Sequence, residues 1–409
     1  MENHKIWVGI DLGASGHQVC VLNQERKVIF ERKIKHEGAA TAKLLDEFVE
    51  LVGGNTELLG VALETPQSAV AEAVLERGFR VYSTNPKQLD RLRDRYTVAG
   101  AKDDRRDAFV LADTLRTDGH HYREVRLGSA EFVHLRQLSR IHDELAAEET
   151  LLANRIDAEL LRYFPEMRAV GSVNTDNWML GLLERATTPS KAGRLRASTV
   201  RGLLVGVRRV TAEEVIAMLR VPGFNVAPGV AEASSHHIEL LIPRLRLVRE
   251  QKRDTHRKIQ SLLDELSEPA EADTQRQPDA AILQSLPGVG TIVGATILAE
   301  AWQPLQDRDS SRLRTLCGSA PVTKRSGKRT MILMRRACSP RLRQALYHWA
   351  RCGTQQDART KAHYRRLREA GHPHGRALRG VADRLLSLLV TLLESGQLFD
   401  PNRWKPISD

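Results

Sequence analysis

Along the first 120 residues, short runs of apolar and β-branched side chains alternate with stretches whose apolar positions recur every three or four residues. The short runs predict strands, and the helically spaced stretches predict helices. Pro66 is expected just inside the start of its helix, where its fixed backbone angle is tolerated. In chain order, the prediction is strands at 6–11, 17–22 and 27–35, a helix at 41–51, a strand at 58–64, a helix at 66–77, a strand at 79–83, and helices at 86–96 and 104–116.

Two of the predicted strands end in an acid, Asp11 in the first and Glu64 in the fourth. Strand ends of an open α/β sheet gather at one edge, where ligands bind. Asp104 and Asp107 follow on a helix that can pack across that edge. The element order is that of the ribonuclease H fold, so we expect an α/β domain over residues 1–125. Four carboxylates in one cleft repel one another unless cations hold them, and Mg²⁺, with Mn²⁺ as an alternative, prefers such oxygen ligands.

Each acid also has a simpler interpretation. The Asp11-Leu-Gly13 turn is similar to the phosphate-loop strand of actin and sugar-kinase ATPases, but no second Asp-x-Gly strand lies downstream. Glu64 is also consistent with an acid at a helix N-terminus. Asp103 is an alternative metal ligand, with Asp104 then acting as a helix cap. Two further acids of the same helix are interpreted as surface charges, Asp113 and Asp118.

The middle of the chain predicts two long helices, at 129–164 and 236–266, the second becoming regular only from Pro243. Two such helices most simply pair as an antiparallel coiled coil, and two ordinary core helices are the alternative. We assign them to a middle domain at 126–268. The insertion between them, 165–235, is interpreted as a small helical subdomain whose basic stretch contacts nucleic-acid backbone or is simply solvated.

After a polar linker, a C-terminal domain is expected at 279–400. Its segment Leu286-Pro-Gly-Val-Gly290 is typical of a helix-hairpin-helix. Gly288 and Gly290 allow a tight turn, and the following helix N-terminus offers its amides to a phosphate. The alternative is a pair of helices that merely pack.

A single small hydroxyl, Ser326, lies beside Gly327 in a strongly basic stretch. Such a serine could attack a phosphodiester, with neighbouring cations stabilising the charge at phosphorus. From the residues alone a phosphate-contacting loop serine is favoured, because the histidines His348 and His363 belong to later helices. The flanking cations are Lys324, Arg325, Lys328 and Arg329.

The charge composition of the chain indicates the class of partner. There are 62 Lys and Arg against 51 Asp and Glu, a net charge of +11, which suggests a polyanionic partner such as nucleic acid. Aromatic residues are only 5%, which argues against single-strand stacking as the main binding mode. The four cysteines form no Cys-x-x-Cys pair, and neither a signal peptide nor a membrane-spanning run is recognisable. We therefore expect a cytoplasmic protein without a membrane partner.

These motifs together carry a family resemblance. The chain resembles the DEDD transposases of the IS110 family, the bridge-RNA-guided serine recombinases. The resemblance covers both ends of the chain, while 165–235 carries no matching motif. The matching segments are Gly9-Ile-Asp11-Leu-Gly13, Glu64-Thr65, Lys102-Asp-Asp104-Arg-Arg-Asp107-Ala108, Pro287-Gly-Val-Gly290, Cys317-Gly-x-Ala-Pro321 and Ser326-Gly-Lys328.

The resemblance implies an enzyme that cuts and rejoins DNA. Asp11, Glu64, Asp104 and Asp107 would be the Mg²⁺-binding acids of a RuvC-like domain, and Ser326 the nucleophile of a C-terminal transposase domain. The acids and the serine would come from different subunits of a tetramer built from dimers, brought together by the coiled coil. A structured bridge RNA would pair with donor and target DNA, near the bacterial nucleoid.

Two rival hypotheses accompany this one. In the first, the protein is a metal-dependent nuclease of the Holliday-junction type, where water attacks and Ser326 only contacts phosphate. In the second, it is a non-catalytic nucleic-acid-binding protein whose acids are structural.

Overall fold

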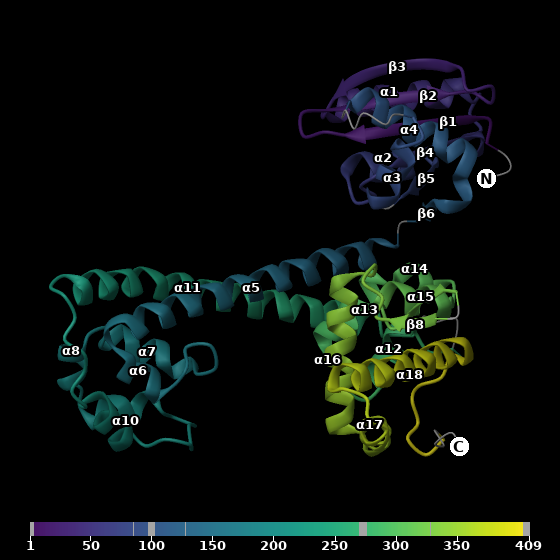
Figure 1. The fold of residues 1–409 in the computed structure, drawn as a ribbon. Coiled ribbons are helices and arrows are strands. Elements are labelled where there is room, and N and C mark those ends of the chain that lie inside the picture. The colour runs from purple at the N-terminus through teal and green to yellow at the C-terminus, as the bar shows by residue number, and fades with distance from the viewer. Residues whose placement is uncertain are drawn as a thin grey trace. The chain divides into compact units, whose positions relative to one another are not determined.

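The computed structural model describes residues 4–84, 86–96, 103–126, 128–269, 276–327 and 329–403. Lys102 of the acidic motif and Lys328 of the serine motif lie outside these ranges. The chain divides into two compact units, Met1–Ser129 and Ala130–Asp409, which are described separately here (Figure 1). None of the described helices is both long enough and apolar enough to cross a membrane.

The first unit is built on one six-stranded sheet in the order β3-β2-β1-β4-β5-β6. β1, β4 and β5 run parallel, and the other neighbouring pairs are antiparallel. The five expected strands are all present, and β6 is an addition whose three residues carry no apolar pattern. The strands are β1 Ile6–Leu12, β2 Gly16–Leu22, β3 Val28–Lys35, β4 Leu59–Leu63, β5 Arg80–Ser83 and β6 Arg123–Val125.

Helices cover both faces of this sheet. Alternate residues of β1 separate the faces: Ile6, Val8 and Ile10 pack with α1 and α2, whereas Trp7 packs with α3 and α4. The helical elements of the unit are α1 Gly38–Leu51, η1 Thr56–Leu58, α2 Ala69–Glu76, α3 Pro86–Arg93, α4 Asp104–Asp118 and η2 Gly119–His121.

The start of α2 differs from the prediction. Pro66 does not lie inside the helix, because the helix begins only at Ala69. The Ser68 side chain accepts a hydrogen bond from the Ala71 amide at 3.2 Å and so caps the first turn. A serine cap three residues from a free amide therefore determines this helix start, rather than the proline.

Gly9 lets α4 lie directly on β1. A Cβ atom added at Gly9 would be 1.9 Å from the Ala108 carbonyl oxygen and 2.9 Å from the Leu111 Cβ. No other residue type fits at this contact, so the glycine of the Gly9-Ile-Asp11 segment fixes how closely the acid-bearing helix approaches the acid-bearing strand.

The second unit begins with a stalk formed by α5 (Ala130–Tyr163) and α11 (Val230–Glu265), which pack antiparallel along each other (Figure 1). α11 starts earlier than expected and continues through Pro243, whose predicted role as a helix start is wrong. The insertion is helical, as expected, and its apolar side chains pack against the stalk. Its helices are α6 Pro165–Val170, α7 Asn177–Arg185, α8 Pro189–Gly193, α9 Ala197–Leu203 and α10 Ala212–Leu219.

The remainder of the second unit is a helical body around a buried cluster that includes Trp349 and Leu386. A two-stranded hairpin, β7 (Val322–Ser326) and β8 (Arg329–Leu333), leaves this body where a loop was expected. β7 is mainly polar, and the apolar residues of β8 are few and largely exposed, so neither strand shows the pattern of a buried strand. The helices are α12 Asp279–Ser285, α13 Thr291–Glu300, α14 Trp302–Gln306, α15 Ser310–Cys317, α16 Pro340–Gln356, α17 Ala358–Glu369 and α18 His374–Ser395.

Candidate active site

Asp11 and Glu64 end neighbouring parallel strands. β1 and β4 pair up to Ile10 and Leu63, so the next residue of each strand is an acid. Both acids are one residue out of phase with the side chains that face α1 and α2, which places them on the face covered by α4. Both are partly exposed. The two carboxylates therefore share one edge and one face of the sheet.

The direction of α4 brings its first turn to this same edge. Arg105, near its start, pairs with Glu31 at 2.7 Å, and Glu31 is level with the middle of β2 and β1. Asp113, further along, pairs with Arg26 at the opposite end of those strands. α4 thus runs antiparallel to β1. Ala108 lies against Gly9. The start of α4 is four helical residues before Ala108, and Asp11 is two strand residues after Gly9. Both separations are about 6 Å along the common direction, so the helix start lies level with Asp11.

Asp103, not Asp104, caps this helix. The Asp103 carboxylate accepts a hydrogen bond from the Arg105 amide at 3.2 Å, and Asp103 has an extended backbone. Asp104 is the first helical residue and is exposed. Of the two arrangements left open by the sequence, the structure has the one in which Asp104 keeps its carboxylate available.

Asp107 is buried and its charge is matched by an arginine. Its side chain is 2% exposed, and Arg93 of α3 donates Nε to one carboxylate oxygen at 2.7 Å and a terminal nitrogen to the other at 2.9 Å. Such a two-point ion pair is strong and geometrically specific. Within the described ranges, no three His, Cys, Asp or Glu side chains are close enough together to hold a metal ion.

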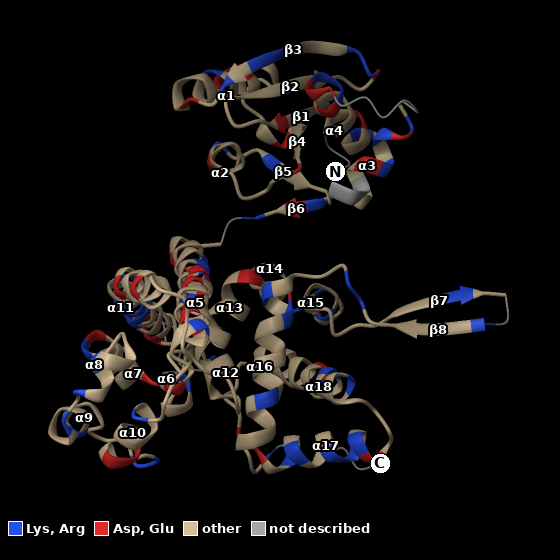
Figure 2. Cartoon of the chain, turned by 60° about the vertical axis from the view of Figure 1, so that its left-hand side comes forward, with Lys and Arg blue, Asp and Glu red and all other residues tan. Residues whose placement is uncertain are grey.

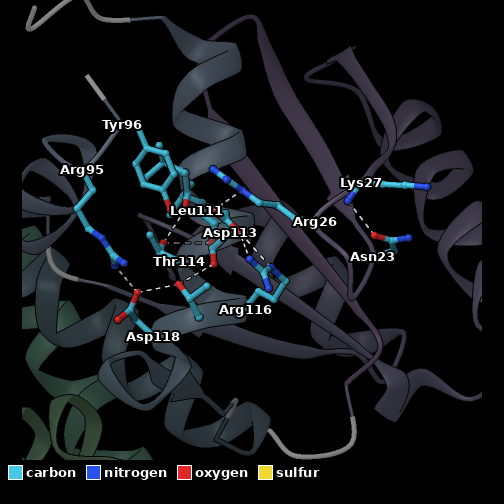
Figure 3. Close-up of polar contacts among 12 residues, drawn as sticks. Asn23, Arg26, Lys27, Arg95, Tyr96, Leu111, Asp113, Thr114, Arg116 and Asp118 are labelled. Atoms are coloured by element: carbon cyan, nitrogen blue, oxygen red, sulfur yellow. Dashed lines mark hydrogen bonds and ion pairs between the residues drawn. The ribbon is translucent and has the colours of Figure 1, made fainter. Parts of the chain in front are cut away.

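Asp113 is not the surface charge that the sequence suggested. It is 3% exposed and lies at the centre of a polar network (Figure 3). Arg26 donates Nε to it at 3.0 Å, Arg116 donates a terminal nitrogen at 2.7 Å, and the Tyr96 hydroxyl donates at 2.8 Å. Burial, together with the bond to Asp113, raises the pKa of Tyr96 to about 12. The network ties α4 to the turn between β2 and β3.

Asp118 also makes polar contacts with its neighbours. A hydrogen bond from Thr117 and an ion pair with Arg95 hold the pKa of Asp118 below its ordinary value (Figure 3). The surface interpretation is therefore wrong for Asp113 and incomplete for Asp118. The arginines that make these contacts, with Arg93, are the residues that sequence reasoning missed. Arg26, Arg93 and Arg95 lie outside α4 and no motif connects them to it, whereas Arg116 is three residues from Asp113 on α4 itself.

The β7–β8 hairpin carries Lys and Arg residues along its strands (Figure 2), and Ser326 is close to its turn. Ser326 is the last residue of β7, it pairs with Arg329, and Gly327 follows in the turn with φ +54°. Ser326 and the cations Lys324, Arg325 and Arg329 are all exposed, while Lys328 is outside the described residues. Among the side-chain hydrogen bonds of the described residues, none involves Ser326, so the hairpin supplies no base to the hydroxyl.

The predicted helix-hairpin-helix is a tight turn between α12 and α13 that packs against α16. Gly288 has φ +84°, and a Cβ there would be 2.4 Å from the Gly353 nitrogen. The Gly288 amide donates to the Gln356 side chain at 2.9 Å. Gly290 is exposed at the start of α13, with nothing within 4 Å of an added Cβ. Gly288 is thus used for packing, and Gly290 alone faces solvent.

The basic stretch of the insertion is partly neutralised within its own unit. Lys191 pairs with Glu239 at 3.1 Å and Arg201 with Glu213 at 2.6 Å. Arg209 pairs with Asp176. These contacts fit a solvated basic face at least as well as a nucleic-acid contact, which stays a prediction for this subdomain.

Two family models match the chain. A transposase family described as the DEDD transposases of IS110 matches residues 8–165. A transposase family described as IS116/IS110/IS902 matches residues 280–365. The first match contains all four candidate acids, and the second contains the helix-hairpin-helix turn and Ser326.

Proteins of bacterial insertion elements are similar to the chain. A candidate transposase, y4uE, of Sinorhizobium fredii is 38% identical over half of this chain and 57% of its own length. A candidate transposase of the mini-circle element IS117 of Streptomyces coelicolor is 29% identical over 97% of this chain and 96% of its own length. An IS110 protein of the same organism is 26% identical over 98% of this chain and 96% of its own length.

Proposed function

The chain belongs to the IS110 family of transposases, and from this premise we propose that it cuts and rejoins DNA strands with Ser326 as the nucleophile and the acidic edge as its partner site. One observation carries the proposal. The two regions that match the family contain the candidate groups: Asp11 and Glu64 follow paired positions of neighbouring parallel strands, and Ser326 is exposed among cations.

The topology of the first unit supports a ribonuclease H-like, RuvC-like domain. Its sheet has the order β3-β2-β1-β4-β5, with three antiparallel strands followed by parallel ones, and α4 crosses β1 at Gly9. This is the arrangement expected from the order of elements in the sequence. It directs the ends of β1 and β4 and the start of α4 to one place.

Mg²⁺, or Mn²⁺, is the proposed ion at this edge. The donors suit it, since hard divalent cations prefer carboxylate oxygens. The arrangement is incomplete, because Asp107 is held by Arg93 and the described acids form no group of three. We propose that Asp11, Glu64 and Asp104 would hold the ion once their carboxylates are drawn together around it, with Asp107 joining only when Arg93 releases it. When bound, such an ion polarises the phosphate and stabilises charge on its oxygens.

The residues of the hairpin account for the cleavage step. The Ser326 Oγ forms a bond to phosphorus, the bond from phosphorus to the sugar oxygen breaks, and a DNA hydroxyl and a phosphoserine result. Attack on that phosphoserine by the hydroxyl of another strand reverses the step and joins the strands. Lys324, Arg325 and Arg329 stabilise the negative charge at phosphorus. No described residue of the hairpin hydrogen-bonds to the Ser326 side chain, so we propose that a carboxylate of the acidic edge of another subunit takes the serine proton.

The proposal includes a composite site and a guide RNA. The acids and the serine come from different subunits of a tetramer, with the stalk joining them, and a structured RNA pairs with donor and target DNA. The chain has a basic surface but no motif that reads base edges, which suits a protein that leaves sequence choice to base pairing.

Purified protein, the element's RNA and duplexes carrying donor and target sequences test this function. Ser326→Ala and Asp104→Asn should each abolish strand exchange while RNA binding survives. Thr330→Ala, which removes an exposed hydroxyl from the neighbouring strand, is the matched control and should recombine normally. Recombination by the Ser326→Ala protein would rule out the serine assignment.

A second candidate function is favoured by one feature of the hairpin, the lack of a base in contact with Ser326 among the described residues. In a metal-dependent nuclease of the Holliday-junction type, water attacks and Ser326 only contacts phosphate. That enzyme would release cut DNA without ever being joined to it.

A further inference from the structure

A pocket of about 280 Å³ lies at the foot of the hairpin, within the second unit. The end of β8 and the residues that follow it form one wall through Leu333 and Arg335. The start of α18 forms another through Arg376 and Arg379. The pocket is therefore lined from two elements that are far apart in sequence, and its position is fixed by the base of the strands that carry Ser326.

The charge of this pocket is strongly one-sided. Asp383 is the single acid among the described residues that line it. Its two carboxylate oxygens accept from Arg314 at 2.6 and 2.7 Å, and the Ser319 hydroxyl donates to it at 2.9 Å. Asp383 is thus committed to Arg314. The remaining arginines of the pocket, Arg335, Arg376 and Arg379, are left without an acid partner among the described residues.

Arg379 is the most constrained of the three. It is half-buried on α18 and also lines a second pocket of about 300 Å³, shared with Arg343. Burial lowers the pKa of Arg379, and the charges of Arg376 and Arg343 lower it further. The Nε of Arg343 is itself buried without a hydrogen-bond partner in the described part of the chain. Crowded, partly desolvated cations are unfavourable alone, and a bound anion removes that cost.

We propose that Arg335, Arg376 and Arg379 bind a backbone phosphate of the DNA strand that Ser326 attacks. This rests on the proposed function for the identity of the strand, whereas the anion site itself rests on the pocket. Guanidinium groups match phosphate geometry with paired donors. The hairpin strand of five residues places Ser326 roughly 15 Å from the pocket. A phosphate held at the foot therefore fixes how far along the DNA strand the hairpin reaches.

The salt dependence of DNA binding tests the site without requiring cleavage. All proteins carry Ser326→Ala, and binding of a labelled duplex with the element-end sequence is measured by fluorescence anisotropy across a series of salt concentrations. Arg379→Gln and Arg376→Gln should each reduce the slope of log affinity against log salt by about 0.9, the loss of one phosphate contact. Arg257→Gln is the control, because that arginine is 79% exposed on the stalk and paired with Asp254.

Each result either supports the phosphate site or overturns it. Arg376 is exposed, so Arg376→Gln leaves the fold intact even if Arg379→Gln lowers the melting temperature. An unchanged slope for Arg376→Gln overturns the site, and so does a reduced slope on the element's RNA transcript but not on the duplex. Arg379→Lys should keep the slope with weaker binding, because the charge stays and the paired donors are lost. If Ser326 proves not to be the nucleophile, these slopes are unaffected, so the two proposals fail separately.

Discussion

Asp11 and Glu64 end adjacent parallel strands of a six-stranded sheet with helices on both faces, whereas Ser326 ends one strand of a two-stranded hairpin that is exposed almost throughout. The acids are positioned by backbone pairing and by a core on each side of the sheet. The serine is positioned by one neighbouring strand. An isolated two-stranded hairpin is only marginally stable in water, whereas a sheet of more strands covered by helices is stable.

This difference indicates a division of tasks. The backbone positions of Asp11 and Glu64 are set by strand pairing, so the cost of ordering them is met during folding. The hairpin carries its serine on an exposed strand with a single neighbouring strand. In the proposed composite site, the reaction would need both regions, because no described residue of the hairpin hydrogen-bonds to the Ser326 side chain.

The largest effect is expected from a substitution in the hairpin. Ser326→Ala should lower the rate of strand exchange by at least about a thousandfold, as expected for loss of a covalent nucleophile. Thermal unfolding of the full chain should be unchanged, since the side chain is exposed and packs against nothing. The readout is product formation on a sequencing gel, with Thr330→Ala as the control.

The second largest effect is expected at Asp104, an exposed acid, in contrast to Asp107, which is paired with Arg93. Asp104→Asn should reduce strand exchange about a hundredfold or more without a change in melting temperature, because Asp104 is exposed and Asp103 provides the cap. Titration calorimetry with Mg²⁺ should show weaker binding than in the wild type. Equal metal affinity in both proteins would remove Asp104 from the proposed ligand set.

A third test concerns stability at the acidic edge. Arg93→Ala leaves Asp107 buried without its partner and should lower the free energy of unfolding by about 3 kcal/mol. Arg91→Ala, an exposed position on the same helix, is the matched control and should change little. Denaturant unfolding of both proteins measures the difference. Equal midpoints would show that the edge does not depend on this ion pair.

Gly9→Ala tests how closely α4 must approach β1. The added methyl would meet the Ala108 carbonyl oxygen, so the helix must shift, at a cost of about 1–3 kcal/mol. Strand exchange should fall with it, because Asp104 moves relative to Asp11. Gly38→Ala, where an added Cβ meets nothing within 4 Å, is the control.

The smallest effect is a pH dependence of the contact between α4 and β3. A hydrogen bond from Arg105 holds the pKa of Glu31 below its ordinary value of 4.5. A lowered folded pKa means that this stabilisation is complete above pH 4.5 and is lost as the pH falls through the folded value. Glu31→Gln should flatten the acid side of the stability curve slightly, since Arg105 is largely exposed. Glu25→Gln, in an exposed turn, should leave that curve as it is.

The same contrast explains what the sequence could predict. Strands β1 to β5 and the long stalk helices were predictable, because buried elements repeat apolar residues at the period of their structure. The hairpin and β6 were not, because short or exposed strands carry no such pattern. Pro66 and Pro243 misplaced two helix starts, since a local preference yielded to the Ser68 cap in one helix and to packing along the stalk in the other.

For the candidate site, the sequence located the acids but not their partners. Acids that follow apolar strands are visible in the sequence, and so is a serine among cations. The Arg93–Asp107 and Arg26–Asp113 pairs depend on how α3 and the β2–β3 turn fold back onto α4. The arginines of the pocket on α18 are likewise ordinary in sequence, and only folding shows that their single acid neighbour is already bound.

The central claim is that Ser326 becomes covalently joined to DNA. The most direct measurement incubates the wild-type protein, its RNA and an end-labelled duplex with the divalent ion, stops the reaction in denaturant and separates the products on a denaturing gel. We expect the wild-type protein to give a labelled band at the mass of protein plus DNA, and peptide mapping of that band should find the phosphate on Ser326. The Ser326→Ala protein should give no such band. Cleaved DNA with no protein attached would contradict the claim and would identify water as the attacking group.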